Sequence, residues 1–287
     1  MPLDNIIDFK PQLDALAVPD KLDFEVGFEE TKVPHKKYVV NTTTGDYLET
    51  VGKSFNCANH GNFFREIQKT LTEELNSQQL DGATVKWRDA RNNGWAMMDL
   101  TLPNSKYTIS NDKHTTEISQ RIIALHGVDG SCSNQVYFGA IDSFCTNGQI
   151  TGEWDKVRRK NTSNFNLDRF IDDLKVAGLE FETTARKQQE WLNTPLNAQL
   201  EDIQKIVKSD KKAEKMFELY KQEQSSRGDN VFALYSAFTN YASYADDRNG
   251  FSLKNTGNDT ASISMWQREH EVAKWVSSNE FERLAAA

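Results

Sequence analysis

The sequence lacks the features that mark membrane-spanning, secreted and disulfide-rich proteins. No apolar run approaches the roughly 20 residues that a membrane helix needs, and no basic segment followed by an apolar one opens the chain. The three cysteines are widely spaced and odd in number, as expected of reduced thiols rather than of a disulfide framework. We therefore expect a cytoplasmic protein that has no membrane partner.

Complete catalytic motifs are missing as well. The stretch VGKSF at residues 51–55 has Tyr47 where a phosphate-binding loop requires glycine. Cys57 and His60 have the spacing of a zinc half-site, but no second pair follows at the required distance. For Cys145 the sequence identifies no histidine base. We therefore expect a protein that is not an enzyme and that uses no cofactor and no metal ion.

Positive charge is outweighed overall, since the net charge is −8. This balance argues against a surface coated with phosphate-binding residues, although only the local patch matters to a polyanion. The acids are segregated: residues 1–30 carry eight of them against Lys10 and Lys21. We expect residues 1–34 to form an acidic N-terminal arm.

Turn signals separate short β-rich runs in the first half of the chain. Between the first two runs, the segment NHGNFFREIQKTLTEELN has apolar residues at helical spacing. It predicts a helix near residues 59–76 with Asn59 as its N-cap. The β-rich runs themselves predict three hairpins, near residues 36–52, 83–103 and 119–145.

After residue 165 the apolar residues repeat at the spacing of helices. The order of elements predicts an α+β fold, in which an antiparallel β-sheet with a crossing helix is followed by a helical C-terminal half. We expect a β-rich core at residues 35–180 and a helical region at residues 181–287, which packs on the core and on neighbouring subunits. Fixed-period repeats and low-complexity tracts are absent from the sequence, which argues against a solenoid.

The basic residues are clustered. In DKVRRKNTSN, cations stand beside small hydroxyl and amide side chains, a mixture suited to phosphate oxygens. In TVKWRDARNNG, strand alternation puts Lys86 and Arg88 on one face and Trp87 on the other, with Arg91 at the turn. Solvated basic surface is the alternative interpretation of both segments. The candidate DNA-binding residues are Lys36, Lys37, Lys86, Arg88, Arg91, Lys156, Arg158, Arg159, Lys160 and Arg227.

Four motifs in order resemble the phage and plasmid family called the domain of unknown function numbered 932. They are DGS at residues 129–131, FCTNG at 144–148, RRKNTSN at 158–164 and NVFALYSAFTNY at 230–241. The resemblance covers roughly residues 35–275. The chain departs from the family's pattern in having Val128 before the DGS turn and Ser236 in the late helix.

The resemblance implies a function and an assembly. The family is similar to phage single-strand annealing proteins, and the order of hairpins and helix resembles the core of the eukaryotic annealing protein Rad fifty-two. It implies ATP-independent binding of single-stranded DNA and annealing of complementary strands in phage recombination. It further implies a ring or helical filament of identical subunits, an annealed duplex intermediate, and a phage exonuclease and a host single-strand-binding protein as partners.

Two other functions stay open from the sequence alone. One is a phage interaction protein that does not bind DNA, such as a host-defence inhibitor whose acidic surface mimics nucleic acid. The other is a metal-dependent nuclease in which Asp129, Asp142 and Glu153 hold magnesium. Binding of single-stranded DNA separates the first from an annealing protein, and metal-dependent turnover reveals the second.

Overall fold

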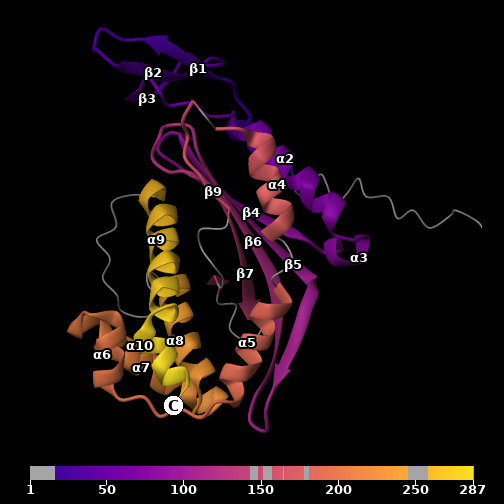
Figure 1. Ribbon diagram of the computed structural model, residues 1–287, viewed down its shortest axis with the longest axis vertical. Coiled ribbons are helices and arrows are strands. Elements are labelled where there is room, and N and C mark those ends of the chain that lie inside the picture. The colour runs from indigo at the N-terminus through magenta and orange to yellow at the C-terminus, as the bar shows by residue number, and fades with distance from the viewer. Residues whose placement is uncertain are drawn as a thin grey trace, which may run out of the picture. The chain divides into compact units, whose positions relative to one another are not determined.

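The computed structural model of the protein describes residues 17–142, 148–150, 157–163, 165–177, 181–244 and 258–286. These residues form an α+β fold with two antiparallel sheets (Figure 1). By their contacts they divide into two units, each assembled from three pieces of the chain. Unit 1 comprises residues 1–105, 121–138 and 153–179, and unit 2 comprises residues 106–120, 139–152 and 180–287.

The small sheet of unit 1 has the order β1-β2-β3. The predicted hairpin at 36–52 is confirmed as β2 (Lys36–Asn41) and β3 (Tyr47–Gly52). A third strand, β1 (Val26–Glu30), pairs antiparallel with β2. It lies inside the segment for which we expected an acidic arm, and it follows a short 3-10 helix, η1 (Asp20–Leu22).

The main sheet has the order β4-β5-β6-β7-β8, and β9 also pairs with β7. The two other predicted hairpins are confirmed, because β4 is followed by β5 and β6 by β7 across short turns. Long strands β5, β6 and β7 contribute residues to both units. The strands are β4 (Thr84–Ala90), β5 (Trp95–Ser110), β6 (Thr115–Gly127), β7 (Asn134–Asp142), β8 (Gly148–Ile150) and β9 (Arg158–Arg159).

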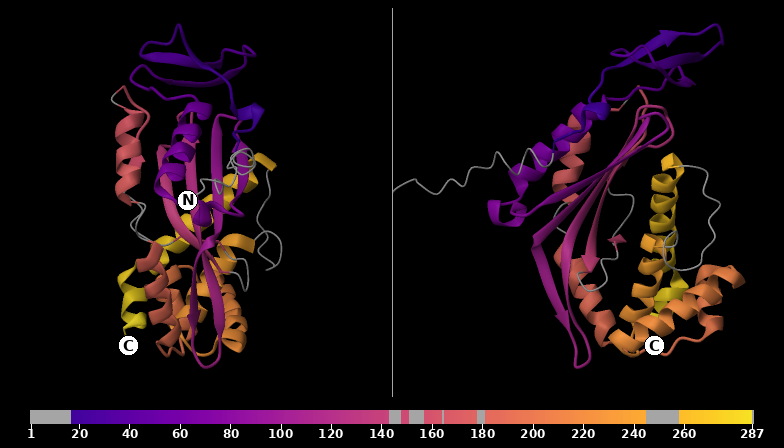
Figure 2. Two further views of the ribbon diagram at one scale, coloured as in Figure 1. Left: turned by 90° about the vertical axis from the view of Figure 1, so that its right-hand side faces the viewer. Right: turned by 180° about the vertical axis from the view of Figure 1, so that it is seen from behind.

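The predicted helix of unit 1 is α2 (His60–Glu74). Its apolar stripe, including Phe63, Phe64 and Ile67, is fully buried. It forms one hydrophobic core with side chains of β4 to β7 and of α4 (Leu167–Ala177), so both helices lie on the same face of the unit 1 strands (Figure 2). The short α3 (Ser77–Leu80) leads into β4.

Asn59 precedes α2 as expected, but its side chain does not cap the helix. Its Oδ1 accepts a hydrogen bond from the backbone N–H of Val26 at 2.9 Å instead. The residue therefore ties the start of β1 to the start of α2.

Unit 2 is mostly helical, as the apolar period after residue 165 predicted. Its core surrounds α8, in which Phe232, Tyr235 and Phe238 have no exposed surface. None of the helices in the described part of the chain is both long and apolar enough to cross a lipid bilayer. The helices are α5 (Phe181–Asn193), α6 (Leu200–Val207), α7 (Asp210–Arg227), α8 (Val231–Tyr244), α9 (Asn258–Val276) and α10 (Asn279–Ala285).

Candidate nucleic-acid interface

Two turns meet at one end of the main sheet in unit 1. The β4–β5 turn, residues 91–94, contacts the β6–β7 turn because Gly94 O accepts hydrogen bonds from the N–H groups of Val128 (2.8 Å) and Asp129 (3.3 Å). Gly94 permits this approach, since a Cβ there would stand 2.8 Å from the Asp129 Cβ. Arg91 Nε donates to Asp129 Oδ2 at 2.5 Å. The cationic side chain of the first turn is therefore fixed to the second turn.

The basic segment around β9 lies on the β6–β7 turn. Arg158 Nε donates to Ser133 Oγ at 2.8 Å. The Asn161 side-chain amide donates to Gly127 O at 2.6 Å and to Cys132 O at 3.2 Å. Because both ends of the turn are bonded to residues 158–161, the cations of this segment are held at the same turn as Arg91.

The small sheet brings a third basic segment to the same end. Ser163 N–H donates to Ser54 O at 2.7 Å, directly after Lys53. Lys53 N–H donates to His35 O at 3.1 Å, and Lys36 is paired with Gly52 across β2 and β3. Three segments that are far apart in the sequence thus place basic residues around the turn end of the main sheet.

These cations differ in how far their charge is already neutralised. Lys36, Arg158 and Lys160 are exposed, and none has a carboxylate partner among the residues that the structure describes. The Nε of Arg158 donates to a neutral hydroxyl. By contrast Arg91 is paired with Asp129 and Glu49, and Arg159 with Asp173. The first three can accept a phosphate without giving up an ion pair.

Lys37 and Lys53 complete this end of unit 1. Lys37 Nζ lies 3.8 Å from the centroid of the Phe28 ring, a cation–π contact that leaves its charge unneutralised by any described carboxylate. Lys53 is exposed and likewise has no carboxylate partner in the described ranges. Sequence reasoning considered Lys53 only as part of an incomplete phosphate-binding loop, and its position beside Ser163 required the fold.

The strand face predicted for Lys86 and Arg88 is confirmed. Trp87, between them, packs against the helix-covered core, while Lys86 is opposite Asp99 in the β4–β5 register. Asp99 is held by Arg121 through two hydrogen bonds of 2.7 and 2.8 Å. Burial raises the pKa of Asp99, but the charges of Arg121, Arg88 and Lys86 outweigh it and the pKa is lowered.

Asp99 is thus bonded to Arg121 and not to the two β4 cations. Within the described chain Lys86 and Arg88 have no hydrogen-bonded carboxylate, and the buried Nε of Arg88 has no acceptor. A guanidinium N–H left without an acceptor is costly, and because this Nε is buried it is not itself open to a phosphate. Arg88 stands three residues before Arg91 on the way to the turn end.

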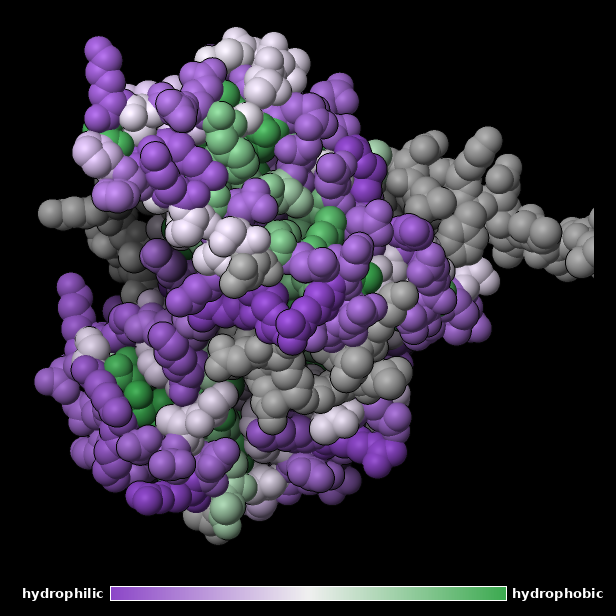
Figure 3. Space-filling model, turned by 45° about the horizontal axis from the view of Figure 1, so that its top comes forward, coloured by the Kyte–Doolittle hydropathy of each residue, from purple (hydrophilic) through white to green (hydrophobic). Residues whose placement is uncertain are grey.

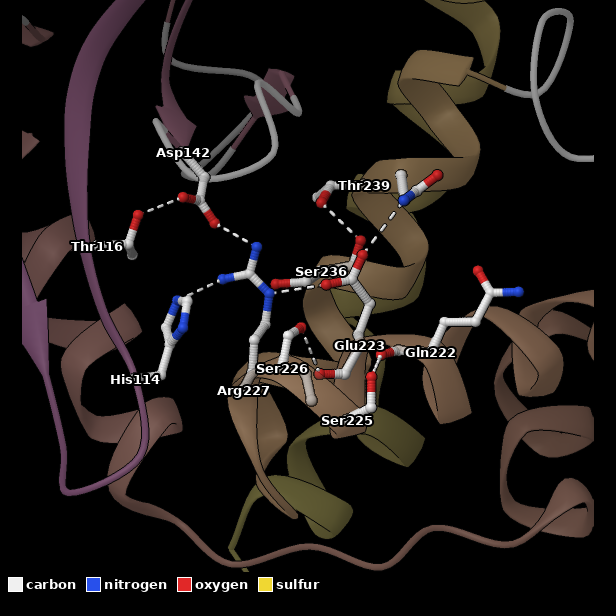
Figure 4. Close-up of polar contacts among 12 residues, drawn as sticks. His114, Thr116, Asp142, Gln222, Glu223, Ser225, Ser226, Arg227, Ser236 and Thr239 are labelled. Carbon is white, nitrogen blue, oxygen red and sulfur yellow. Dashed lines mark hydrogen bonds and ion pairs between the residues drawn. The ribbon is translucent and has the colours of Figure 1, made fainter.

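Arg227 does not belong to this set, which corrects the prediction that it contacts DNA. Its side chain has no exposed surface. It is paired with Asp142 at 2.8 Å and with Glu223 at 2.7 Å, and it donates to His114 Nε2 at 2.9 Å (Figure 4). A guanidinium that is enclosed and neutralised by two carboxylates cannot reach a phosphate. Arg227 is part of the interior of unit 2.

The remaining candidates are placed as follows. Lys156 lies outside the described residues, as do Glu153 and Cys145. Asp129 is engaged by Arg91 and by the Ser131 N–H at 2.9 Å, and Asp142 by Arg227 and Thr116. Among the residues that the structure describes, no cluster of three His, Cys, Asp or Glu side chains is arranged to hold a metal ion.

Comparison with known proteins gives a family but no activity. The family model described as domain of unknown function (DUF932) matches residues 47–276. The chain belongs to this family. No curated protein and no solved structure matches the chain.

Two of the motifs that suggested DUF932 meet in the candidate interface. The DGS motif, residues 129–131, is the centre of the β6–β7 turn, and the RRKNTSN motif supplies Arg158 and Asn161, which bond that turn. The late motif forms α8 in unit 2, and FCTNG falls mostly outside the described residues. Asn161, which sequence reasoning did not single out as a site residue, is the group that joins the first two motifs.

Proposed function

We propose that this DUF932 protein binds single-stranded DNA through the turn end of unit 1 and anneals complementary strands without a nucleotide. The observation that carries the proposal is the set of exposed cations without carboxylate partners in the described chain, Lys36, Lys53, Arg158 and Lys160, drawn from separate segments to one end of the sheet. Phosphate contacts supply most of the affinity of proteins for nucleic acid regardless of sequence.

A protein that anneals strands needs little besides a cationic surface of this kind. Cations hold the backbone, the bases remain available for pairing, and no covalent bond is made or broken. Lys86 and Arg88 on β4 extend the cationic surface away from the turn. We further propose that subunits line up as a ring or filament so that this surface becomes continuous, with an exonuclease and a single-strand-binding protein as partners in phage recombination.

The structure sharpens the choice of variants for a test. Arg159 is already paired with Asp173, so the informative double substitution is R158A with K160A. Its control is K187A with K211A, which removes the same charge from exposed positions on α5 and α7 of unit 2, where neither lysine has a carboxylate partner among the described residues. Affinity for a labelled single strand is measured at several salt concentrations.

The expected result is weaker binding to every sequence, because phosphates carry no base information. The salt dependence should become shallower by a slope of roughly 0.7 per lost contact, or about 1.4 for two. Annealing of complementary oligonucleotides should fall in parallel, with chelator present and ATP absent throughout. Superimposable salt plots for parent and R158A/K160A, or a failure of the parent to anneal strands under these conditions, would overturn the proposal.

A further inference from the structure

Exposed apolar side chains are concentrated on the small sheet. Among the described residues, the large apolar side chains classed as exposed are Phe28, Val33, Tyr47 and Tyr107. Three of these four belong to β1, β3 or the loop after β1. In Figure 3, which brings the top of Figure 1 forward, pale and green side chains interrupt hydrophilic ones in the upper part of the molecule. Of the four exposed apolar side chains, Tyr47 has the largest exposed fraction, 53%.

The two faces of the small sheet differ. One face packs inward, where Val51 and the following Phe55 lie so close to Gly130 of the β6–β7 turn that a Cβ on this glycine would stand 3.3 and 3.5 Å from them. Strand alternation puts Lys36 and Tyr38 on the other face, and Tyr47 joins them because it pairs with Val40. The outward face therefore carries two aromatic rings and an exposed cation in neighbouring positions.

Tyr47 has contacts at its ring and at its hydroxyl although 53% of it is exposed. Its ring meets Tyr38 edge to face, with centroids 5.8 Å apart and planes at 81°. Its hydroxyl is bonded to Thr50 Oγ1 at 2.9 Å and to Glu49 Oε1 at 3.3 Å. A ring that is fixed at both ends and open to solvent loses little entropy when another flat group stacks on it.

Charged side chains lie near the rings of Tyr38 and Tyr47, and their sign affects which ligands can bind there. Lys36 is two residues from Tyr38 on the same strand, at about 6.6 Å given a rise of about 3.3 Å per residue. The position opposite Lys36 is Gly52, where a Cβ would meet nothing within 4 Å, so the surface there is bare. Two carboxylates also lie near the rings: Glu29 of β1 is opposite Tyr38, and Glu49, which is paired with Arg91, accepts from the Tyr47 hydroxyl.

We infer that Tyr47 and Tyr38 form a base-stacking platform for single-stranded nucleic acid, with Lys36 holding the adjoining phosphate. The inference rests on the proposed function and deepens it: the phosphate surface at the turn end of the main sheet continues onto a surface that binds unpaired bases. Aromatic stacking accepts every base, because each has a flat π face, but it requires that the base be free of its duplex partner. The platform therefore selects single strands over duplexes.

Removal of the bases tests the platform directly. Binding of the full chain is compared between an ordinary single-stranded oligonucleotide and an abasic one with the same number of phosphates. The parent should prefer the ordinary strand, and Tyr47→Ala should reduce that preference by about fivefold or more, the effect of one lost stacked base. Tyr47→Phe keeps the ring and should keep the preference. Tyr107→Ala removes an exposed tyrosine from β5 and is the matched control.

The outcomes separate the platform from the phosphate surface. Equal affinity of the parent for ordinary and abasic strands would overturn the platform and leave the proposed function standing. No binding of either strand would overturn both. If Tyr47→Ala does not fold, Tyr47→Leu supplies an apolar side chain without the ring, and an undiminished base preference in that variant would again overturn the inference. Glu29→Gln should tighten binding of both strands.

Discussion

His126 Nδ1 lies 2.8 Å from His60 Nδ1 in the core of unit 1. His60 Nε2 lies 2.8 Å from Asn93 O, so His60 carries its proton on Nε2 and its Nδ1 accepts the hydrogen bond from His126. Both rings are fully buried, and the His126 ring stacks on Phe63 with centroids 4.3 Å apart. A second proton on His60 would point two N–H groups at each other, and a second proton on His126 would lie on its buried Nε2, which has no hydrogen-bond partner among the described residues. Both imidazoles are therefore neutral.

The first prediction is a loss of stability in mild acid. Burial lowers the pKa of His60 to about 4 and that of His126 well below 6.5. Between pH 6.5 and about 4 the unfolded chain therefore binds protons that the folded chain does not. The free energy of unfolding should rise with pH across this window, by at most about 1.4 kcal/mol per pH unit for each histidine. Urea denaturation at a series of pH values measures the slope.

Replacing His126 with Phe removes one of the two groups and keeps an aromatic ring beside Phe63. The free energy of unfolding should then change less steeply with pH between pH 4 and pH 6.5. The decrease in slope should be at most about 1.4 kcal/mol per pH unit, which corresponds to one proton. An unchanged slope would show that other groups cause the acid sensitivity.

The second prediction concerns the contact between the two turns. Gly94→Ala should destabilise the protein by about 1–3 kcal/mol, because its Cβ would lie 2.8 Å from the Asp129 Cβ and 3.0 Å from Arg91 O. Gly52→Ala adds the same methyl group where nothing lies within 4 Å. Thermal denaturation should show a lower midpoint for Gly94→Ala alone, and equal midpoints would argue against close packing of the turns.

The third prediction separates Arg227 from the interface. Arg227→Met leaves Asp142 and Glu223 without their common cation and should cost about 3–5 kcal/mol of stability. At a temperature where the variant is folded, its salt slope for single-stranded DNA should equal that of the parent. A shallower slope would return Arg227 to the DNA-binding set.

The hairpins and the helix α2 of unit 1 could be predicted from the sequence, because the turn residues and the apolar spacing that specify them lie within one short segment. The turn RNNG has three residues in the left-handed region, Arg91, Asn92 and Asn93, and asparagine tolerates that conformation. The stripe of α2 likewise repeats within one segment. Strand β1 escaped prediction since VGFEE combines a glycine with two acids, and it forms a strand by pairing with β2.

The site was harder to predict, because ion pairs and hydrogen bonds between residues far apart in the sequence decide which cations are buried or neutralised. Arg227, at the end of a helix beside Gly228, has the sequence context of an exposed cation, and its burial depends on His114, which is 113 residues earlier in the chain. In the same way Arg158 and Arg159 are adjacent and equally basic, but only the fold gives Arg159 the partner Asp173. Which cation remains available to a phosphate is a property of the tertiary structure.

The interleaved composition of the two units bears on how the protein can be dissected genetically. Unit 1 takes its residues from three stretches that end within or between strands and helices, at 105, 138 and 179, and unit 2 takes the stretches in between and the C-terminal remainder. No single truncation isolates either unit, because residues 1–179 hold all of unit 1 but also carry residues 106–120 and 139–152 of unit 2. Loss of activity on deletion would therefore not assign that activity to the deleted unit. Assignment of roles to the two units depends on point substitutions in the full-length chain.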